Sequence, residues 1–226
     1  MRVLDVLRYK KMIAVIWIGF ILFPNPVVLP LNMYRLFEMP VQPSQEVRQI
    51  AETLPANGTL IEHYVDEQVR YTYDFQSYGV VWYIPAPNDV LKSQMGDCKS
   101  RAVLLASLLE AKGIPHSVSI SPVHFWVDYE GRPSTNFSVQ YETPEAAIVQ
   151  NGHVKMPQKA TMLLYLNAYI DIVWTSMPLL RKVLLISGLA LVVQYGHFKE
   201  AKMALRGRLL EVIPRFKLLM QHLSRL

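Results

Sequence analysis

The residue best suited to chemistry is Cys98, the only cysteine among the 226 residues of the chain. It follows Gly-Asp in the stretch SQMGDCKSRAVLLASLLEAKGIP, residues 93–115, at the point where a helix is expected to begin. A thiol at a helix N-terminus faces free backbone N–H groups and the positive end of the helix dipole, which lower its pKa. The sequence therefore predicts a nucleophile at Cys98, and the alternative is a small structural side chain in a core helix.

A histidine that could activate the thiol follows 26 residues later, where His124 begins a predicted strand. A strand that pairs beside the helix would bring the imidazole to the thiol, and a third polar group would orient the ring. Asn136 is the first candidate for that group, because it lies just past the predicted turn at 130–133. Asp128 shares a strand face with His124 and could also orient the ring. It is only a fallback, because it lies about 13 Å along the strand.

An acyl-transfer reaction would also need donors for a developing oxyanion. The backbone N–H of Cys98 is the natural first donor, and Gln94 or Trp82 is a candidate for the second. A zinc site built from Cys98, His116 and His124 is disfavoured, because the paired ligand spacing typical of zinc sites is missing. No glycine-rich phosphate loop is present, so neither a metal nor a cofactor is expected.

The helix that would carry Cys98 is predicted to be the centre of the fold. Its apolar residues cover well over half of the helix circumference, which requires burial on most sides. Gly113 supplies a C-cap and Pro115 a stop. The next segments, 116–120 and 124–129, alternate as strands, and NFSVQYE would add a third.

The strand 124–129 should present two different faces, because successive side chains point to opposite sides. His124, Trp126 and Asp128 fall on one face. The other face carries Phe125, Val127 and Tyr129. These elements predict an α+β core, in which one buried helix packs on a small antiparallel sheet.

Upstream of the core helix, the sequence predicts short capped helices and extended segments. The helices are QEVRQIAETL after Ser44, LIEHYVDEQVR after Thr59 and DVLKSQ after Asn88. The stretches VRYTYD and VVWYIP are rich in aromatic and β-branched residues, which suits strands or extended packing segments.

Both ends of the chain carry long apolar stretches, and hydrophobic residues make up 51% of the sequence against 18% charged. Residues 12–34 follow a basic segment, 1–11, and reach the roughly 20 residues that a helical membrane span needs. No small-residue cleavage site follows, so a retained signal anchor is expected. Residues 183–198 form a second candidate span, preceded by an apolar interfacial or membrane-entering segment at 159–182.

The charge distribution predicts an orientation for such spans. Segment 1–11 has four Lys and Arg against one Asp, and segment 199–226 has seven against two acidic residues. Segment 35–158 has nine basic against fourteen acidic residues. The positive-inside rule then places both termini in the cytoplasm and 35–158 outside, with 199–226 as an amphipathic tail on membrane lipids. The acidic centre argues against nucleic-acid binding, and a single cysteine excludes an internal disulfide.

The stretches "WYIPAPNDVL", "MGDCKSRAVLLASLLEAKGIP" and "HFWVDYEG" together resemble the transglutaminase-like superfamily of papain-like cysteine enzymes. The resemblance covers roughly residues 61–142. It implies that Cys98 is the nucleophile and that His124 is the general base and acid. Family members usually continue with a Trp and an Asp after the histidine strand, and this chain offers Asn136 instead, similar to the asparagine of papain-like enzymes. Asp128, Gln140 and Glu142 are the fallbacks for this third member.

The resemblance implies an enzyme that attacks a peptide, isopeptide or glutamine amide carbonyl in a peptide or protein substrate. The apolar ends of the chain predict that this enzyme is anchored in the membrane. Hydrolysis is expected rather than cross-linking, because nothing in the sequence suggests a tunnel for a second substrate. The alternative is an inactive interaction or assembly module in the membrane that keeps the same fold. The sequence does not predict an oligomeric state.

Overall fold

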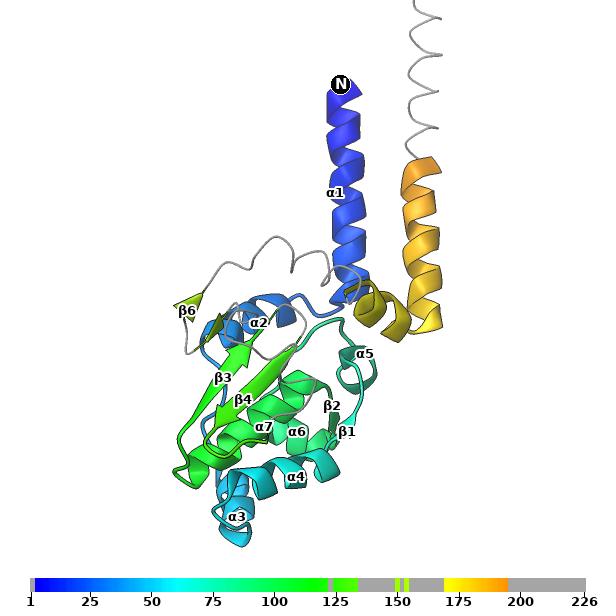
Figure 1. Ribbon diagram of the computed structural model, residues 1–226. Helices are drawn as coiled ribbons and strands as arrows, with labels where there is room; N and C mark the ends of the chain where they lie inside the picture. Colours follow the sequence, from blue (N-terminus) through cyan, green and yellow to red (C-terminus); the bar gives the residue numbers. More distant parts are fainter. Residues whose placement is uncertain (1–2, 122–123, 134–148, 151–152, 155–168, 195–226) are drawn as a thin grey trace, which may run out of the picture. The chain divides into compact units, whose positions relative to one another are not determined.

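The computed structural model describes residues 3–121, 124–133, 149–150, 153–154 and 169–194 (Figure 1). The chain divides into two compact units, and each is described by itself. One comprises Met1–Ile21 with Leu179–Leu226, and the other comprises Leu22–Pro178. The predicted strand NFSVQYE and the predicted tail 199–226 lie outside the described residues.

The described elements follow one another along the chain, and Figure 1 labels most of them. They are α1 (Val3–Leu22), α2 (Val28–Phe37), α3 (Gln45–Thr53), α4 (Gly58–Gln68), β1 (Arg70–Tyr71), α5 (Asp74–Ser77), α6 (Pro87–Ser93), β2 (Met95–Gly96), α7 (Cys98–Ala111), β3 (His116–Ile120), β4 (Phe125–Tyr129), β5 (Val149–Gln150), β6 (His153–Val154) and the π-helix η1 (Asp171–Thr175). Residues 179–194 form a further helix, in addition to the labelled elements.

The predicted fold class, an α+β core flanked by transmembrane helices, is wrong. Helices take up 62% of the described residues, and the strands form only two small sheets. The sequence predicts that the segments VVWYIP and VRYTYD form strands or extended packing segments. VVWYIP contains no strand, and VRYTYD contributes only the two residues of β1. Their aromatic and β-branched residues instead pack in an irregular segment that polar side chains hold in place.

The predicted two-span membrane topology, with both termini in the cytoplasm, is wrong as well. Among the described residues, no helix combines the length and the apolar character that crossing a bilayer requires. Segment 12–34 is divided between α1 and α2, because the chain leaves the helix at Leu22, just before Pro24 and Pro26. The uncharged part of α1, from residue 12 to residue 22, is only about 17 Å long at the rise of an α-helix.

The hydrophobic core is built around α7, as the sequence predicts. This helix packs against α3, α4, α6, β3 and β4, and Figure 1 shows β3 and β4 running beside it. Val103, Leu104, Leu108 and Leu109 are completely buried. A helix that is apolar on most sides gains stability only when neighbours cover it all round, which explains its central place.

The strands beside α7 follow the predicted pattern. β3 and β4 are antiparallel, with Val118 opposite Val127 and Ser119 opposite Trp126. Phe125, Val127 and Tyr129 of β4 belong to the core cluster, as the alternation predicts. β5 pairs with the other edge of β3, and β6 pairs with β5, so the sheet order is β4-β3-β5-β6.

The helix starts agree only in part with the prediction. Ser44 caps α3 and accepts a hydrogen bond from the Val47 N–H, as predicted. The cap of α4 is Asn57 rather than Thr59, because the side chain of Asn57 reaches the Leu60 N–H. The predicted cap at Asn88 is also wrong, because α6 already begins at Pro87, a residue whose missing N–H suits the first helical turn.

The irregular segment between α5 and α6 is held by buried polar groups. Asn32 of α2 is fully buried, donates to the Trp82 carbonyl at 2.7 Å and accepts from the Ile84 N–H at 3.0 Å. Asp74 of α5 accepts from the Tyr83 N–H at 2.8 Å. These bonds satisfy backbone groups that a sheet ladder would otherwise pair, which removes the need for a strand here.

In the other unit, the described residues form two helices, α1 and residues 179–194. The indole N–H of Trp17 donates to the Leu184 carbonyl at 3.2 Å. A side chain at Gly188 would overlap the Trp17 ring, so the glycine permits a close approach of the two helices. This small pair contributes no residue to the core around α7.

Candidate active site

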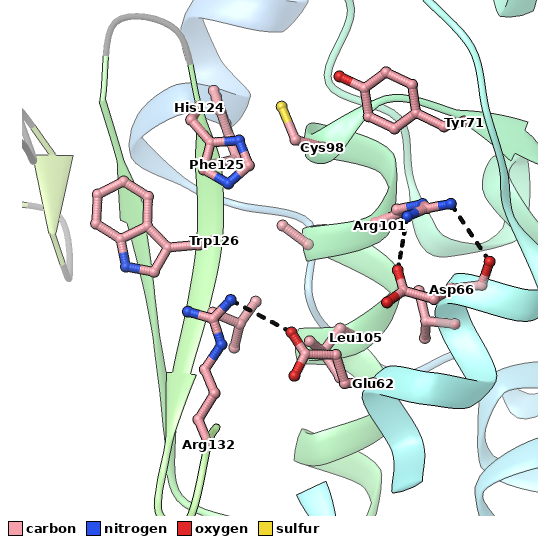
Figure 2. A pocket seen from close by; sticks show the side chains of 13 residues that line it. Glu62, Asp66, Tyr71, Cys98, Arg101, Leu105, His124, Phe125, Trp126 and Arg132 are labelled. Carbon is pink, nitrogen blue, oxygen red and sulfur yellow. Dashed lines mark hydrogen bonds and ion pairs between the residues drawn. The ribbon is translucent and has the colours of Figure 1, made fainter. Parts of the chain in front are cut away.

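A cavity of about 310 Å³ opens between α4, β1, the start of α7 and β4. Cys98 and His124 both line the cavity, as do Tyr71, Arg101 and Trp126. Figure 2 shows the side chains of Cys98 and His124 on facing sides of the cavity, one from the helix and one from the start of the strand. The fold therefore brings together two residues that are 26 positions apart in the sequence.

Cys98 occupies the first position of α7. Asp97 is the N-cap of this helix, and its carboxylate accepts from the Lys99 N–H at 3.0 Å. The backbone of Phe125, the residue after His124, lowers the pKa of the Cys98 thiol. Cys98 therefore begins α7 on the side of the cavity that faces the start of β4.

The pKa of Cys98 does not follow the prediction of a thiol activated by the helix N-terminus. Burial, and next the neighbouring Asp97 carboxylate, raise the pKa of the thiol to about 12. Lys99 and the Phe125 N–H lower it, but by less. At neutral pH the resting group is therefore a protonated thiol, which needs a base to become a nucleophile.

Directly behind Cys98, two buried carboxylates share one buried ammonium group. The Lys99 Nζ lies 2.9 Å from Asp74 Oδ2 and also contacts Asp97 Oδ2. Burial lowers the pKa of Lys99, but the carboxylates of Asp97 and Asp74 raise it more, so the ammonium stays charged. Burial raises the pKa of Asp74 to about 7, against the opposing effect of Lys99. This cluster anchors the first turn of α7, and its carboxylates add to the effect of burial in disfavouring a thiolate at Cys98.

His124 is held by its backbone and by its ring. Its N–H donates to Ser121 Oγ at 3.0 Å, and its carbonyl accepts from the Ser121 N–H at 2.8 Å. The imidazole stacks on Trp126 with 6.1 Å between ring centroids and 10° between ring planes. Trp126 is buried and therefore held in place, so stacking on its ring restricts the orientation of the imidazole.

Asp128, the predicted fallback for orienting His124, instead holds Trp126. Its Oδ2 accepts from the Trp126 indole N–H at 3.0 Å and from Ser119 Oγ at 3.2 Å. Arg132 lies 3.8 Å from its other carboxylate oxygen. Asp128 therefore supports the histidine through the stacked indole, two residues along the strand.

The other predicted site residues are placed elsewhere. Asn136, the predicted third member of the triad, lies outside the described residues. Gln94 ends α6 in a left-handed conformation, and its carbonyl accepts from the Arg70 N–H. Among the described residues that line the cavity, neither Gln94 nor Trp82 appears. Their roles as oxyanion donors stay predictions.

Tyr71 and Arg101 line the cavity beside Cys98, and sequence reasoning gave neither of them a role. The Arg101 guanidinium lies over the Tyr71 ring, 5.5 Å from its centroid. It also donates to Asp66 at 2.7 Å and to the Val69 carbonyl at 2.8 Å. Arg101 is three residues after Cys98 and so lies on the same side of the helix, which is the one signal in the sequence that could have pointed to it.

A second ion pair crosses the cavity farther from Cys98. Arg132, just past the end of β4, lies 3.4 Å from a carboxylate oxygen of Glu62 on α4. Figure 2 shows this pair and the Arg101–Asp66 pair as two links to α4. All four residues of these pairs line the cavity, so charged side chains line it in addition to the thiol.

Among the described residues, no group of three His, Cys, Asp or Glu side chains is arranged to hold a metal ion. No protein-family model matches the chain, and no curated protein matches it.

Proposed function

We propose that the chain is a transglutaminase-like cysteine enzyme that cleaves an amide bond through a thioester intermediate. Cys98 would be the nucleophile, and His124 would be the general base and then the general acid. The observation that carries the proposal is the placement of both side chains on facing sides of one cavity.

The raised pKa of Cys98 determines how the reaction would begin. Because the resting thiol is protonated, His124 would take its proton as the sulfur attacks the carbonyl carbon. The carbonyl π electrons move to oxygen, and collapse of the tetrahedral intermediate expels the amine, which takes the proton from His124. Water, activated by the same histidine, then hydrolyses the thioester and regenerates the thiol.

The substrate class would be a peptide, an isopeptide or a glutamine side chain in a peptide or protein. The cavity of about 310 Å³ is lined by charged side chains, Glu62, Asp66, Arg101 and Arg132, as well as by the thiol and the imidazole, which suits a polar peptide chain. Hydrolysis is proposed over cross-linking, because a second substrate amine would need its own approach to the acyl group.

The test uses iodoacetamide, because a chain with one cysteine gives an unambiguous readout by intact mass. At pH 7 the wild-type protein should be alkylated about 10²-fold faster than His124→Ala, since a positioned general base contributes at least that factor. His116→Ala is the matched control and should react like the wild type. The Nδ1 atom of His116 is hydrogen-bonded to the Ile114 carbonyl, and His116 is not among the described residues that line the cavity.

A second candidate function is an inactive transglutaminase-like interaction module. The observation that favours it is the raised pKa of Cys98, which is expected of a buried structural thiol. Equal, slow alkylation of the wild type, His124→Ala and His116→Ala would support this candidate and contradict the enzyme.

A further inference from the structure

Tyr71 lines the same cavity as Cys98, and the pairing of β1 with β2 places it there. β1 and β2 are parallel, with Tyr71 opposite Gly96, two residues before the cysteine. The Arg70 N–H donates to the Gln94 carbonyl, and the Thr72 N–H donates to the Gly96 carbonyl, both at 3.0 Å. The backbone of Tyr71 is therefore tied on both sides to the segment that leads into Cys98.

The side chain of Tyr71 is held with its hydroxyl toward the thiol. Figure 2 shows the phenol oxygen at the end of the ring nearest the Cys98 sulfur, above Arg101. Arg101 stacks on the ring and is itself fixed by Asp66 and the Val69 carbonyl, so the ring rests on an immobilised guanidinium. The Tyr73 ring meets the Tyr71 ring edge-on, with 6.0 Å between centroids.

The protonation state of Tyr71 suits a donor. Partial burial, and then the nearby Cys98, raise the pKa of Tyr71 above its ordinary value. The phenol therefore keeps its proton at every pH at which the enzyme would work. Half of the residue remains exposed, so a bound carbonyl can reach the hydroxyl.

We infer that Tyr71 is a catalytic residue of the proposed reaction, whose hydroxyl donates a hydrogen bond to the carbonyl oxygen attacked by Cys98. The inference rests on the proposed function and assigns the second donor of the oxyanion site, next to the Cys98 backbone N–H. As the carbon–sulfur bond forms, the carbonyl oxygen gains negative charge, and a fixed donor stabilises that charge more than the neutral carbonyl. The proton stays on Tyr71, and the amine still takes its proton from His124.

The test compares two reactions of the same sulfur. Acylation by p-nitrophenyl acetate passes through an oxyanion, whereas alkylation by iodoacetamide displaces iodide and forms none. Tyr71→Phe should slow acylation of Cys98 about 10²-fold, the loss measured when one oxyanion donor is removed, and should leave alkylation unchanged. Tyr73→Phe is the matched control and should change neither rate, because Tyr73 is not among the described residues that line the cavity.

The outcomes separate this inference from the proposed function. Unchanged acylation in Tyr71→Phe, with a wild type that is alkylated faster than His124→Ala, would overturn the role of Tyr71 alone. Equal slowing of both reactions would also overturn it, because the residue would then act on the thiol rather than on the oxyanion. Slow alkylation that does not depend on His124 would overturn the proposed function and the inference with it.

Discussion

Cys98 follows an aspartate and precedes a lysine, and in the fold these three neighbours interact through space as well as along the chain. Asp97 does two things at once, because it caps α7 and places a negative charge beside the thiol. The cap stabilises the helix that carries Cys98, whereas the charge disfavours its thiolate. A substitution that separates the two effects would show how far the carboxylate controls the reactivity of the site.

Asp97→Asn keeps a cap acceptor and removes the charge, so the pKa of Cys98 should fall. The thiolate is then more abundant at any given pH, and alkylation should be about tenfold faster at pH 8, the effect of about one pKa unit. The measurement is the rate of iodoacetamide alkylation from pH 6 to pH 10. For the wild type the rate should still be rising at the top of this range, because its pKa is about 12. For Asp97→Asn the rise should begin at lower pH.

Glu110→Gln is the control, because Glu110 is an exposed carboxylate at the opposite end of α7. It should leave the pH profile of alkylation unchanged. If Asp97→Asn and Glu110→Gln both match the wild type, the charge of Asp97 does not act on Cys98.

At the scale of elements, the junction between β2 and α7 has no free space. Gly96 pairs with Tyr71 in the small parallel sheet and lies against the first turn of α7. A Cβ at Gly96 would overlap the Cβ and Oγ of Ser100, which is completely buried. The glycine therefore lets the strand and the helix approach closely enough to place Tyr71 beside Cys98.

Gly96→Ala should destabilise the fold by about 1–3 kcal/mol, the usual effect of overpacking a well-packed site. Urea unfolding followed by circular dichroism measures the free energy of unfolding. In a Ser100→Gly background the clash is relieved, so the same Gly96→Ala change should be less destabilising there. Gly19→Ala is the control, because a Cβ at Gly19 of α1 has no atom within 4 Å to meet, and it should be neutral or slightly stabilising. An equal loss for Gly96→Ala in both backgrounds would contradict the packing account.

At the scale of the whole molecule, the core and the candidate site belong to one of the two units. All residues of the core cluster around α7, and all described residues that line the cavity, lie within Leu22–Pro178. A unit with its own buried core has what a domain needs to fold alone. The unit formed by α1 and residues 179–194 shares none of these core residues.

A fragment of residues 22–178 should therefore fold and keep the reactivity of Cys98. We expect one cooperative unfolding transition by circular dichroism, and an iodoacetamide alkylation rate within a factor of two or so of that of the full chain. The fragment carrying Leu104→Ala serves as the control, and its stability should fall by about 2–5 kcal/mol, because Leu104 is fully buried in the core. A non-cooperative transition of the unaltered fragment would show that the other unit is needed for folding.

Local patterns in the sequence were sufficient to predict the core helix and the two strands beside it. The apolar positions of α7, its start at Cys98 and the alternation in β4 depend on periodicity, which neighbouring residues alone determine. The same patterns misplaced two helix starts and left VVWYIP open between a strand and an extended packing segment. The second alternative holds, because buried side chains from distant positions, Asn32 and Asp74, satisfy that backbone. The predicted membrane span 12–34 failed for a related reason. The stretch has enough apolar residues in total, but α1 ends at Leu22, so they do not form one helix.

The sequence by itself determined that a thiol stands at the start of a buried helix and that a histidine begins a nearby strand. Only the tertiary structure decided the state of that thiol, because its pKa depends on burial and on the charges of Asp97 and Asp74. Only the tertiary structure placed Tyr71 and Arg101 at the site, through the pairing of β1 with β2 and the stacking of a guanidinium on a ring. Short-range periodicity specifies which face of an element is buried, whereas electrostatics and long-range pairing depend on which residues meet after folding.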